Sequence, residues 1–328
     1  MNRILLTGGA GYIGSHTAKC LSQAGFEPVT IDDLSSGHTW AVKWGPFIKG
    51  DIGDQNLIRE VVAEYRIQAV LHFAAYTYVG ESITDPRKYF RNNVARTLHM
   101  LDTLMDCSVK HIIFSSSCAT YGDPERVPIA ESHPQRPVNP YGESKLMVER
   151  ILHWYDSAYG IKAACLRYFN AAGADPDGEL GETHAPETHL IPLVIHAALG
   201  SIDSVSVFGT DYETPDGTAI RDYTHVCDLA DAHVLALRYL LNGGSSVHLN
   251  LGTGCGHSVL EVIQAVEEIS GRRVPVRRSD RRLGDPPVLV ADAAKVGEVL
   301  NWRVRFADLR EIVRTAWNWH SRSVNRAE

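Results

Sequence analysis

The chain has 328 residues, of which 44% are hydrophobic and 22% are charged, the composition of an ordinary folded protein with one large core or two lobes. Its formal net charge of −7 argues against a nucleic-acid partner, because phosphate binding requires a basic face. Its longest apolar run, "LIPLVIHAALG", has about half of the roughly 20 residues that a membrane-spanning helix needs, so we expect no membrane partner.

The start of the chain and its cysteines indicate the compartment. A glycine-rich motif begins almost at Met1 and leaves no room for a secretory or transit segment, so we expect none. The six cysteines are scattered singly, without a C-x-x-C pair or the spacing of metal ligands. This pattern favours a reducing, cytoplasmic setting and predicts no metal site.

Short apolar runs rich in β-branched residues alternate with amphipathic stretches over the first half of the chain. The expected strands are "RILLTG", "EPVTID", "PFIKGD", "AVLHFA", "HIIFSSS" and "IKAACLRY". The expected helices are Tyr12–Ala24, Gln55–Tyr65, Asn93–Cys107 and Tyr141–Tyr159. Alternating strands and helices predict an α/β fold with a Rossmann-type, doubly wound parallel sheet that is buried on both faces.

From about Asn170 this alternation gives way to the loop-rich stretch "AAGADPDGELGETHAPETH". Helices and isolated strands follow at "IPLVIHAALG", "VSVFG", "DLADAHVLALRYLL", "VHLNLG", "VLEVIQAVEEIS" and near Asp308–His320. We therefore predict a nucleotide-binding domain over residues 1–169. A smaller α/β substrate-binding domain is expected over residues 170–328, with some segments returning to the first domain.

The first expected strand leads into Gly8-x-x-Gly11-x-x-Gly14 and then into a helix. Such glycines permit a tight turn and close approach of the backbone to a pyrophosphate, which the helix N-terminus then faces. About 20 residues later, "VTIDDL" ends in Asp32 and Asp33, whose carboxylates can bind ribose hydroxyls and would repel a 2′-phosphate. A glycine-rich turn without a ligand is the alternative for the loop alone, but this context predicts NAD.

The ends of the later strands carry further candidates. Asp51 and Ile52 end the third expected strand and are placed to touch the adenine, although Asp51 is equally suited to cap a helix. Three hydroxyls, Ser115–Ser117, end the fifth strand at the edge where such sheets bind ligands. We expect at least two of them to do no more than satisfy nearby backbone groups.

In "NPYGESK", Tyr141 lies four residues before Lys145, so both side chains are expected on one face of a helix. A free phenol titrates near 10, too high for a base at neutral pH. Lys145 and the positive charge of an oxidised nicotinamide would both favour the phenolate. The spacing alone often arises by chance, and the preceding glycine loop, ribose acid and hydroxyl-rich strand end make it specific.

The order of these motifs resembles the extended short-chain dehydrogenase/reductase family, and nearly the whole chain is similar to the UDP-glucose 4-epimerase branch of that family. The matching stretches include "TGGAGYIGSHT", "HFAAY", "SSSCATYG", "NPYGESKLMVE", "LRYFNAAGA" and "GTDYETPDGTAIRDYTHVCDLADAH". The last of these is long and irregular, which makes it more specific than any glycine motif.

The resemblance implies that NAD takes a hydride from sugar C4 and returns it to the opposite face of a 4-ketopyranose, a net isomerisation. The catalytic residues would be Tyr141, Ser117 and Lys145. The cofactor-binding residues would be Gly8, Gly11, Tyr12, Ile13, Gly14, Asp32, Asp33, Asp51, Ile52, Phe73, Ala74, Ala75, Asn92, Ser115, Tyr141, Lys145 and Tyr168.

The resemblance also implies a UDP-hexose site built from Ser117, Tyr141, Asn170, His189, Leu190, Ser206, Phe208, Arg221, Arg282, Asp285 and Leu289. Asn170 and the two arginines would hold the diphosphate or the uridine ribose, with Phe208 along the uracil. A surface ion pair is the alternative for either arginine. Thr77 stands where the family often has a cofactor-contacting Lys, and His189 where it often has an amide.

Other activities use the same fold. Nucleotide-sugar dehydratases carry an Asp–Glu pair after the strand-five hydroxyl, where this chain has Cys118 and Ala119. Catalytically inactive NAD-sensing relatives usually lose the Tyr or the Lys, and this chain keeps both. A 4-epimerase of UDP-xylose/UDP-arabinose or of UDP-N-acetylhexosamines remains open. Leu289, which by resemblance lines the sugar pocket and is intermediate in size, favours the UDP-glucose/UDP-galactose pair.

A homodimer is expected from excess apolar surface. The helix that begins near Tyr141 has two apolar stripes, Met147/Ile151/Trp154 and Val148/Leu152/Tyr155, and the helix Asn93–Cys107 carries Leu98, Leu101, Leu104 and Met105. One stripe can cover the sheet and leave the other for a partner. By resemblance these two helices pair into a four-helix bundle, and burial of both stripes within one chain is the alternative.

Overall fold

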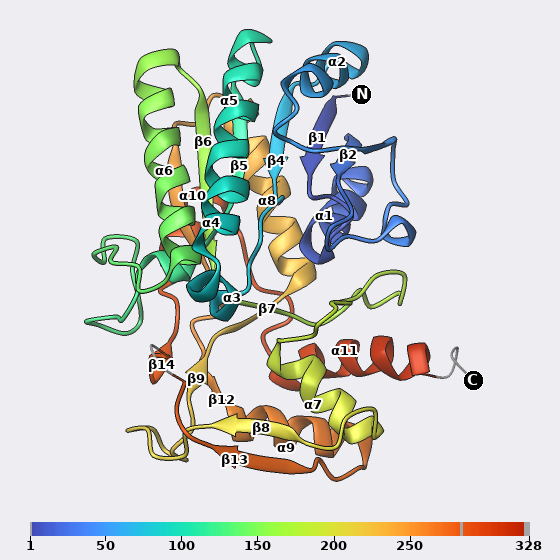
Figure 1. Ribbon diagram of the computed structural model, residues 1–328, viewed down its shortest axis with the longest axis vertical. Coiled ribbons are helices and arrows are strands. Elements are labelled where there is room, and N and C mark those ends of the chain that lie inside the picture. The colour runs from blue at the N-terminus through green and yellow to red at the C-terminus, as the bar shows by residue number, and fades with distance from the viewer. Residues whose placement is uncertain (1, 283–284, 325–328) are drawn as a thin grey trace.

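The computed structural model describes residues 2–282 and 285–324, and its largest element is a seven-stranded parallel sheet (Figure 1). The strand order is β11 (Val247–Leu251), β6 (Lys162–Tyr168), β5 (His111–Ser117), β4 (Ala69–His72), β1 (Arg3–Thr7), β2 (Glu27–Asp32) and β3 (Phe47–Lys49). The order reverses between β1 and β4, the topology of a doubly wound Rossmann-type sheet. The predicted fold class is confirmed.

Helices cover both faces of this sheet. One face carries α1 (Tyr12–Gln23), α8 (Val226–Leu241) and α10 (Ala294–Leu300), and the other carries α2 (Gln55–Tyr65), α5 (Thr97–Asp106) and α6 (Pro140–Tyr159). Successive strand residues point to opposite faces, so Ile4 and Leu6 join one core while Leu5 joins the other. This is why the strands are almost uniformly apolar rather than alternating.

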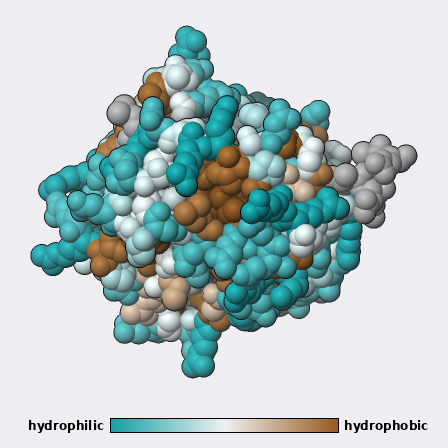
Figure 2. Space-filling model, turned by 90° about the horizontal axis from the view of Figure 1, so that it is seen from below, coloured by the Kyte–Doolittle hydropathy of each residue, from teal (hydrophilic) through white to brown (hydrophobic). Residues whose placement is uncertain are grey.

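The smaller domain lies beyond the carboxyl ends of the strands (Figure 1). Its core is formed by α7 (Leu190–Leu199), β8 (Val205–Phe208), α9 (Val259–Ser270), β10 (Tyr223–His225) and α11 (Leu309–Val324). Its remaining strands are β7 (Asn170–Ala172), β9 (Ile220–Arg221), β12 (His257–Ser258), β13 (Val276–Ser279) and β14 (Val288–Leu289). The end of the molecule that it forms is mostly hydrophilic around one larger apolar patch near its centre (Figure 2).

Short helices connect the larger elements: η1 (Thr39–Ala41), α3 (Val79–Thr84), α4 (Pro86–Tyr89) and η3 (Cys118–Thr120). A π-helix, η2 (Phe90–Arg96), runs into α5. The helix predicted over Asn93–Cys107 therefore begins earlier and is wider in its first part. The buried Asn93 side chain bonds both backbone groups of Tyr76 and the hydroxyl of Ser144, contacts that hold this segment in its wider form.

The cap that begins α2 corrects one sequence-based alternative. Asp54, not Asp51, caps this helix, because its carboxylate accepts the N–H groups of Asn56 and Leu57. Asp51 instead accepts the N–H of Gly53 and forms an ion pair with a side chain of η2. Among the helices of residues 2–282 and 285–324, none has the length and apolar character needed to cross a membrane.

A buried ion pair ties α6 to the sheet. Arg167 on β6 donates two hydrogen bonds to the carboxylate of Glu149 on α6, at 2.6 and 2.9 Å, and both side chains are at most 4% exposed. The same carboxylate accepts the hydroxyl of Ser116 on β5 at 2.6 Å, and Arg167 also donates to the phenol oxygen of Tyr121. Both charged groups of this pair are thus hydrogen-bonded by other side chains of the chain.

We predict that Arg167→Met lowers the free energy of unfolding by about 3–5 kcal/mol, because it leaves the Glu149 carboxylate buried without its cation. Urea titration followed by circular dichroism measures this loss. Replacing both Glu149 and Arg167 by Met should recover much of it. Arg136→Met, which breaks the exposed pair with Glu125, should leave the midpoint nearly unchanged. A loss as small in Arg167→Met as in Arg136→Met would contradict the prediction.

Candidate active site

A cavity of about 410 Å³ lies at the carboxyl ends of the strands, between the sheet and the smaller domain. Every residue predicted to bind the cofactor lines it: Gly8, Gly11, Tyr12, Ile13, Gly14, Asp32, Asp33, Asp51, Ile52, Phe73, Ala74, Ala75, Asn92, Ser115, Tyr141, Lys145 and Tyr168. The catalytic candidate Ser117 lines it too. Segments spread over most of the chain therefore converge on one cavity.

The glycine loop has no room for side chains at two of its positions. Gly8 has a φ of 73°, and a Cβ there would lie 2.6 Å from the backbone N of Ala74. A Cβ on Gly14 would lie 2.4 Å from the carbonyl oxygen of Gly8, so α1 packs directly on the loop. Gly11 begins α1 without a side-chain cap, which leaves the first N–H groups of the helix facing the cavity for an anion.

The acids at the end of β2 are held by backbone groups. One carboxylate oxygen of the buried Asp32 accepts the N–H of Ala10 at 3.0 Å, and the other accepts the N–H of Leu34 at 2.8 Å. Asp33 accepts the N–H of Ser35. These bonds use one lone pair on each oxygen of Asp32 and orient the carboxylate toward the cavity, the position that a ribose-binding acid requires.

Tyr141 and Lys145 are buried side by side on α6. The Ser117 hydroxyl lies near the phenol of Tyr141 and favours its charged form, and the Ser117 oxygen accepts the N–H of Ala119. The Lys145 ammonium donates to the carbonyl oxygen of Ser115 at 2.7 Å and lies 5.9 Å from the centre of the Tyr141 ring. Ser117 is thus placed to hand a proton to or from the phenol.

Burial shifts both of these groups toward their neutral forms. It raises the pKa of Tyr141 well above the ordinary value of 10, and it lowers the pKa of Lys145 to about 7 although Glu149 opposes the shift. Burial keeps the phenol neutral in the chain alone, and the expectation that Lys145 and an oxidised nicotinamide together favour the phenolate stays a prediction. A phenolate at neutral pH requires a further positive charge in the cavity.

The three serines at the end of β5 have separate tasks. Ser115 forms a short hydrogen bond with the Tyr168 hydroxyl, and Ser116 bonds to Glu149. Only Ser117 faces the phenol of Tyr141. The prediction that at least two of the three do no more than satisfy nearby backbone groups is wrong, because the hydroxyls of Ser115 and Ser116 bond side chains of neighbouring elements.

The smaller domain contributes Asn170, His189, Arg221, Asp285 and Leu289 to the lining. The guanidinium of Arg221 contacts the Asp285 carboxylate and donates to the carbonyl oxygen of Ile220 at 2.7 Å. Its side chain is only 11% exposed, so the pair is not the exposed surface bridge that was the alternative for this arginine.

Four predicted substrate residues lie outside this lining and stay predictions. Leu190 begins α7, next to His189. The hydroxyl of Ser206 accepts a hydrogen bond from Arg277 at 3.0 Å. The guanidinium of Arg282 lies 3.9 Å above the centre of the Phe208 ring, a cation–π contact.

Three ionisable residues of the cavity wall were missed by the motifs. Glu182 and His184 line the cavity beside His189, and all three come from the loop-rich stretch before α7. The signal was present as Glu-x-His-x-x-Glu-x-His in "ETHAPETH", a spacing that a search limited to cysteines overlooks. Arg96, which forms the ion pair with Asp51 at 3.0 Å, also lines the cavity.

Known proteins are similar to this chain in sequence and in structure over nearly its whole length. The sequence model of the NAD dependent epimerase/dehydratase family matches residues 4–252. The chain belongs to this family. It is 52% identical over 320 residues to a UDP-glucose 4-epimerase of Rhizobium leguminosarum bv. trifolii, covering 98% of each chain.

Solved structures of family members superpose closely on this chain. The UDP-glucose 4-epimerase of Brucella ovis in complex with NAD superposes with a TM-score of 0.95 at 53% identity, over 97% of this chain and 98% of that one. The Bifidobacterium longum enzyme in complex with NAD⁺ and UDP superposes with a TM-score of 0.94 at 38% identity, over 99% of each chain.

Within a family that also includes dehydratases, the residues after Ser117 become informative. Cys118 and Ala119 line the cavity, and neither supplies the carboxylate that loss of water requires.

Proposed function

We propose that the chain interconverts UDP-glucose and UDP-galactose by transient oxidation at sugar C4, with NAD as a cofactor that it retains through turnover. The observation that carries this proposal is the meeting of Tyr141, Ser117 and Lys145 in one cavity, where positions 118 and 119 bear no acid. The named relatives at about half identity over nearly full length support it.

The cavity fits NAD. The uncapped start of α1 and the side-chain-free Gly8 and Gly14 suit a pyrophosphate, and Asp32 suits a ribose without a 2′-phosphate. When bound, NAD accepts a hydride from the sugar and gives it back. Its oxidised ring also brings the positive charge that Tyr141 lacks in the chain alone.

The chain's own groups move the proton. Tyr141 takes the proton of the sugar 4-hydroxyl, with the Ser117 hydroxyl beside it, and returns it when the hydride comes back. The Lys145 ammonium lies close enough to the phenol to interact electrostatically with the charge on it. Arg221 and Asn170 hold the UDP at the opposite wall, which leaves the sugar free to present either face.

The proposal predicts that purified protein converts UDP-galactose to UDP-glucose without added NAD, and that denaturing it releases NAD into the supernatant. Tyr141→Phe should lower turnover by about 10²- to 10⁴-fold, the usual effect of losing a positioned acid–base group. UDP binding by calorimetry should barely change, because the phenol faces the sugar. Protein that binds NAD and UDP but makes no UDP-glucose would favour an NAD-sensing role, and a near-normal Tyr141→Phe would remove Tyr141 as the base.

We propose that Leu289 limits the size of the sugar. It lines the cavity, and β14 places it beside Arg221 of β9. A 2-acetamido group adds several heavy atoms, and overpacking costs ~1–3 kcal/mol. This corresponds to a roughly 5- to 150-fold poorer N-acetyl substrate.

Leu289→Ser should therefore raise the ratio of kcat/KM for UDP-N-acetylglucosamine over UDP-glucose, and Leu289→Tyr should lower it while sparing the plain hexoses. Coupled assays with both sugars measure the ratio. An unchanged ratio in Leu289→Ser, or equal use of both sugars by the unmodified protein, would show that this side chain does not limit the pocket.

We propose a homodimer through α6. Val148 and Leu152 of one stripe are at most 2% exposed, whereas Met147 and Trp154 of the other are 37% and 67% exposed. Ile83, 57% exposed, lies on α3, which packs against α6. Exposed apolar side chains grouped on adjacent helices are typical of an interface.

Light scattering at micromolar concentration should give twice the mass of one chain, and Trp154→Glu should shift the protein toward a monomer. Val276→Glu, at a similarly exposed apolar position on β13, is the matched control and should leave the mass unchanged. A monomeric unmodified protein would contradict the proposal.

A cytoplasmic location is proposed as well, since all six cysteines are free thiols, the state that a reducing compartment favours.

A further inference from the structure

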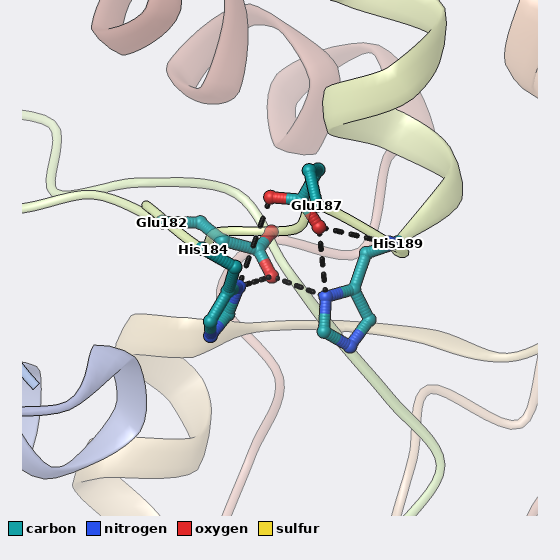
Figure 3. Close-up of side chains that lie close together, drawn as sticks. All are labelled: Glu182, His184, Glu187 and His189. Carbon is teal, nitrogen blue, oxygen red and sulfur yellow. Dashed lines mark hydrogen bonds and ion pairs between the residues drawn. The ribbon is translucent and has the colours of Figure 1, made fainter. Parts of the chain in front are cut away.

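Four side chains from the stretch before α7 converge with their ligand atoms facing one another (Figure 3). The Nδ1 atoms of His184 and His189 lie 3.3 and 2.8 Å from the same carboxylate oxygen of Glu182. The carboxylate of Glu187 completes the group, 3.7 Å from His184 Nδ1 and 3.2 Å from His189 Nδ1. Two imidazoles and two carboxylates therefore meet in one place.

Hydrogen bonds account for only part of this convergence, because Glu187 accepts from the backbone N–H of His189 and bonds its Nδ1, whereas other ligand atoms are left unpartnered. Glu182 is 3% exposed, and its Oε1 has no hydrogen-bond partner although two imidazoles approach it. Nδ1 of His184 is also buried and has no hydrogen-bond partner. Buried polar atoms normally have partners. A single proton on an Nδ1 also points at one acceptor, whereas each Nδ1 here faces two carboxylates.

A second cluster of the chain shows the contrast. Asp175, Asp177 and Glu179 also converge, but the ammonium of Lys19 lies among them at 2.7–2.8 Å and neutralises them. Within residues 2–282 and 285–324, Glu182 and Glu187 form ion pairs only with the two histidines. The Glu/His cluster therefore lacks a fixed side-chain cation of its own.

We propose that Glu182, His184, Glu187 and His189 form a tetrahedral site for a zinc-type divalent cation. Zinc binds His N and carboxylate O at about 2.0–2.2 Å, which places tetrahedral ligand atoms about 3.3–3.6 Å apart. The four cross-distances of 2.8–3.7 Å bracket this value. Imidazole ligands favour zinc over Mg²⁺ or Ca²⁺, which prefer oxygen alone. Two carboxylates with two neutral imidazoles also match a charge of +2.

The proposed metal site would stabilise the wall of the active-site cavity. Glu182, His184 and His189 line that cavity, and His189 is the residue from which α7 begins. The ring of His184 also meets the edge of Tyr12 in the glycine-loop helix, with centroids 6.4 Å apart. Four protein ligands leave no open position, so the role is structural. His189 then orients the start of α7 instead of binding the diphosphate directly.

The test uses the full chain with an affinity tag that contains no histidine. The protein is stripped with dipicolinate, re-equilibrated with Zn²⁺, gel-filtered and measured by mass spectrometry of the metal. We expect close to one zinc per chain, a higher Tm with Zn²⁺ than with Mg²⁺, and visible d–d bands of a tetrahedral site with Co²⁺.

Variants locate the metal. His184→Ala and Glu187→Gln should each weaken zinc binding by more than about 100-fold, since even outer-sphere changes cost about 10- to 100-fold. His153→Ala, an exposed histidine of α6, and Asp177→Asn of the Lys19 cluster should retain it. Circular dichroism shows whether each variant folds. If a variant does not fold, the Co²⁺ spectrum of the unmodified chain decides whether a tetrahedral metal site is present.

Two results would overturn the proposal. If the stripped chain takes up no zinc, the cluster is held by protons on its imidazoles. If the His184 and Glu187 variants bind as much zinc as the unmodified chain, the metal sits on other histidines, of which the chain has 15 in all.

Discussion

The ion pair between Glu149 and Arg167 fixes the element on which the proposed chemistry depends. Tyr141, Lys145 and Glu149 follow one another at intervals of four on α6, so they share one face of the helix. Glu149 is tied to β6 through Arg167 and to β5 through Ser116. The helix cannot slide without leaving a buried charge uncompensated, a costly change. The phenol is consequently held against Ser117 with little freedom.

The same burial sets the electrostatics of the cavity. A low dielectric favours the neutral forms of both the phenol and the ammonium, which is why the pKa of Tyr141 rises while that of Lys145 falls to about 7. It also strengthens the effect of any charge that enters. In the proposed reaction, the chain supplies position and the oxidised cofactor supplies the charge. This division suits a catalyst whose cofactor changes charge twice in each turnover.

The loop between the domains carries two groups of converging carboxylates, and the chain compensates them differently. Lys19 of α1 enters the first group and fastens the loop to the cofactor domain. The second group faces histidines, whose charge depends on what binds them. The first group is thus compensated by a permanent cation of the chain, whereas the second, which contributes to the cavity wall, faces only groups whose charge can change.

Local sequence determined the elements of this protein and singled out the residues proposed to transfer the proton. Strand periodicity located β2 and β5, the glycine spacing located the phosphate loop, and a four-residue interval placed Tyr141 beside Lys145, because each of these signals lies within one element. The wider start of α5 was missed, since it depends on Asn93 bonding the distant backbone of Tyr76.

Only the tertiary structure decided how separate segments meet. It selected Val148 and Leu152 as the buried stripe of α6, paired Arg221 with Asp285, and kept Ser206 and Phe208 out of the cavity lining. It also joined two glutamates and two histidines into one cluster. These outcomes depend on how far a loop folds back and which neighbour desolvates a side chain, and neither is encoded in the periodicity of a single helix or strand.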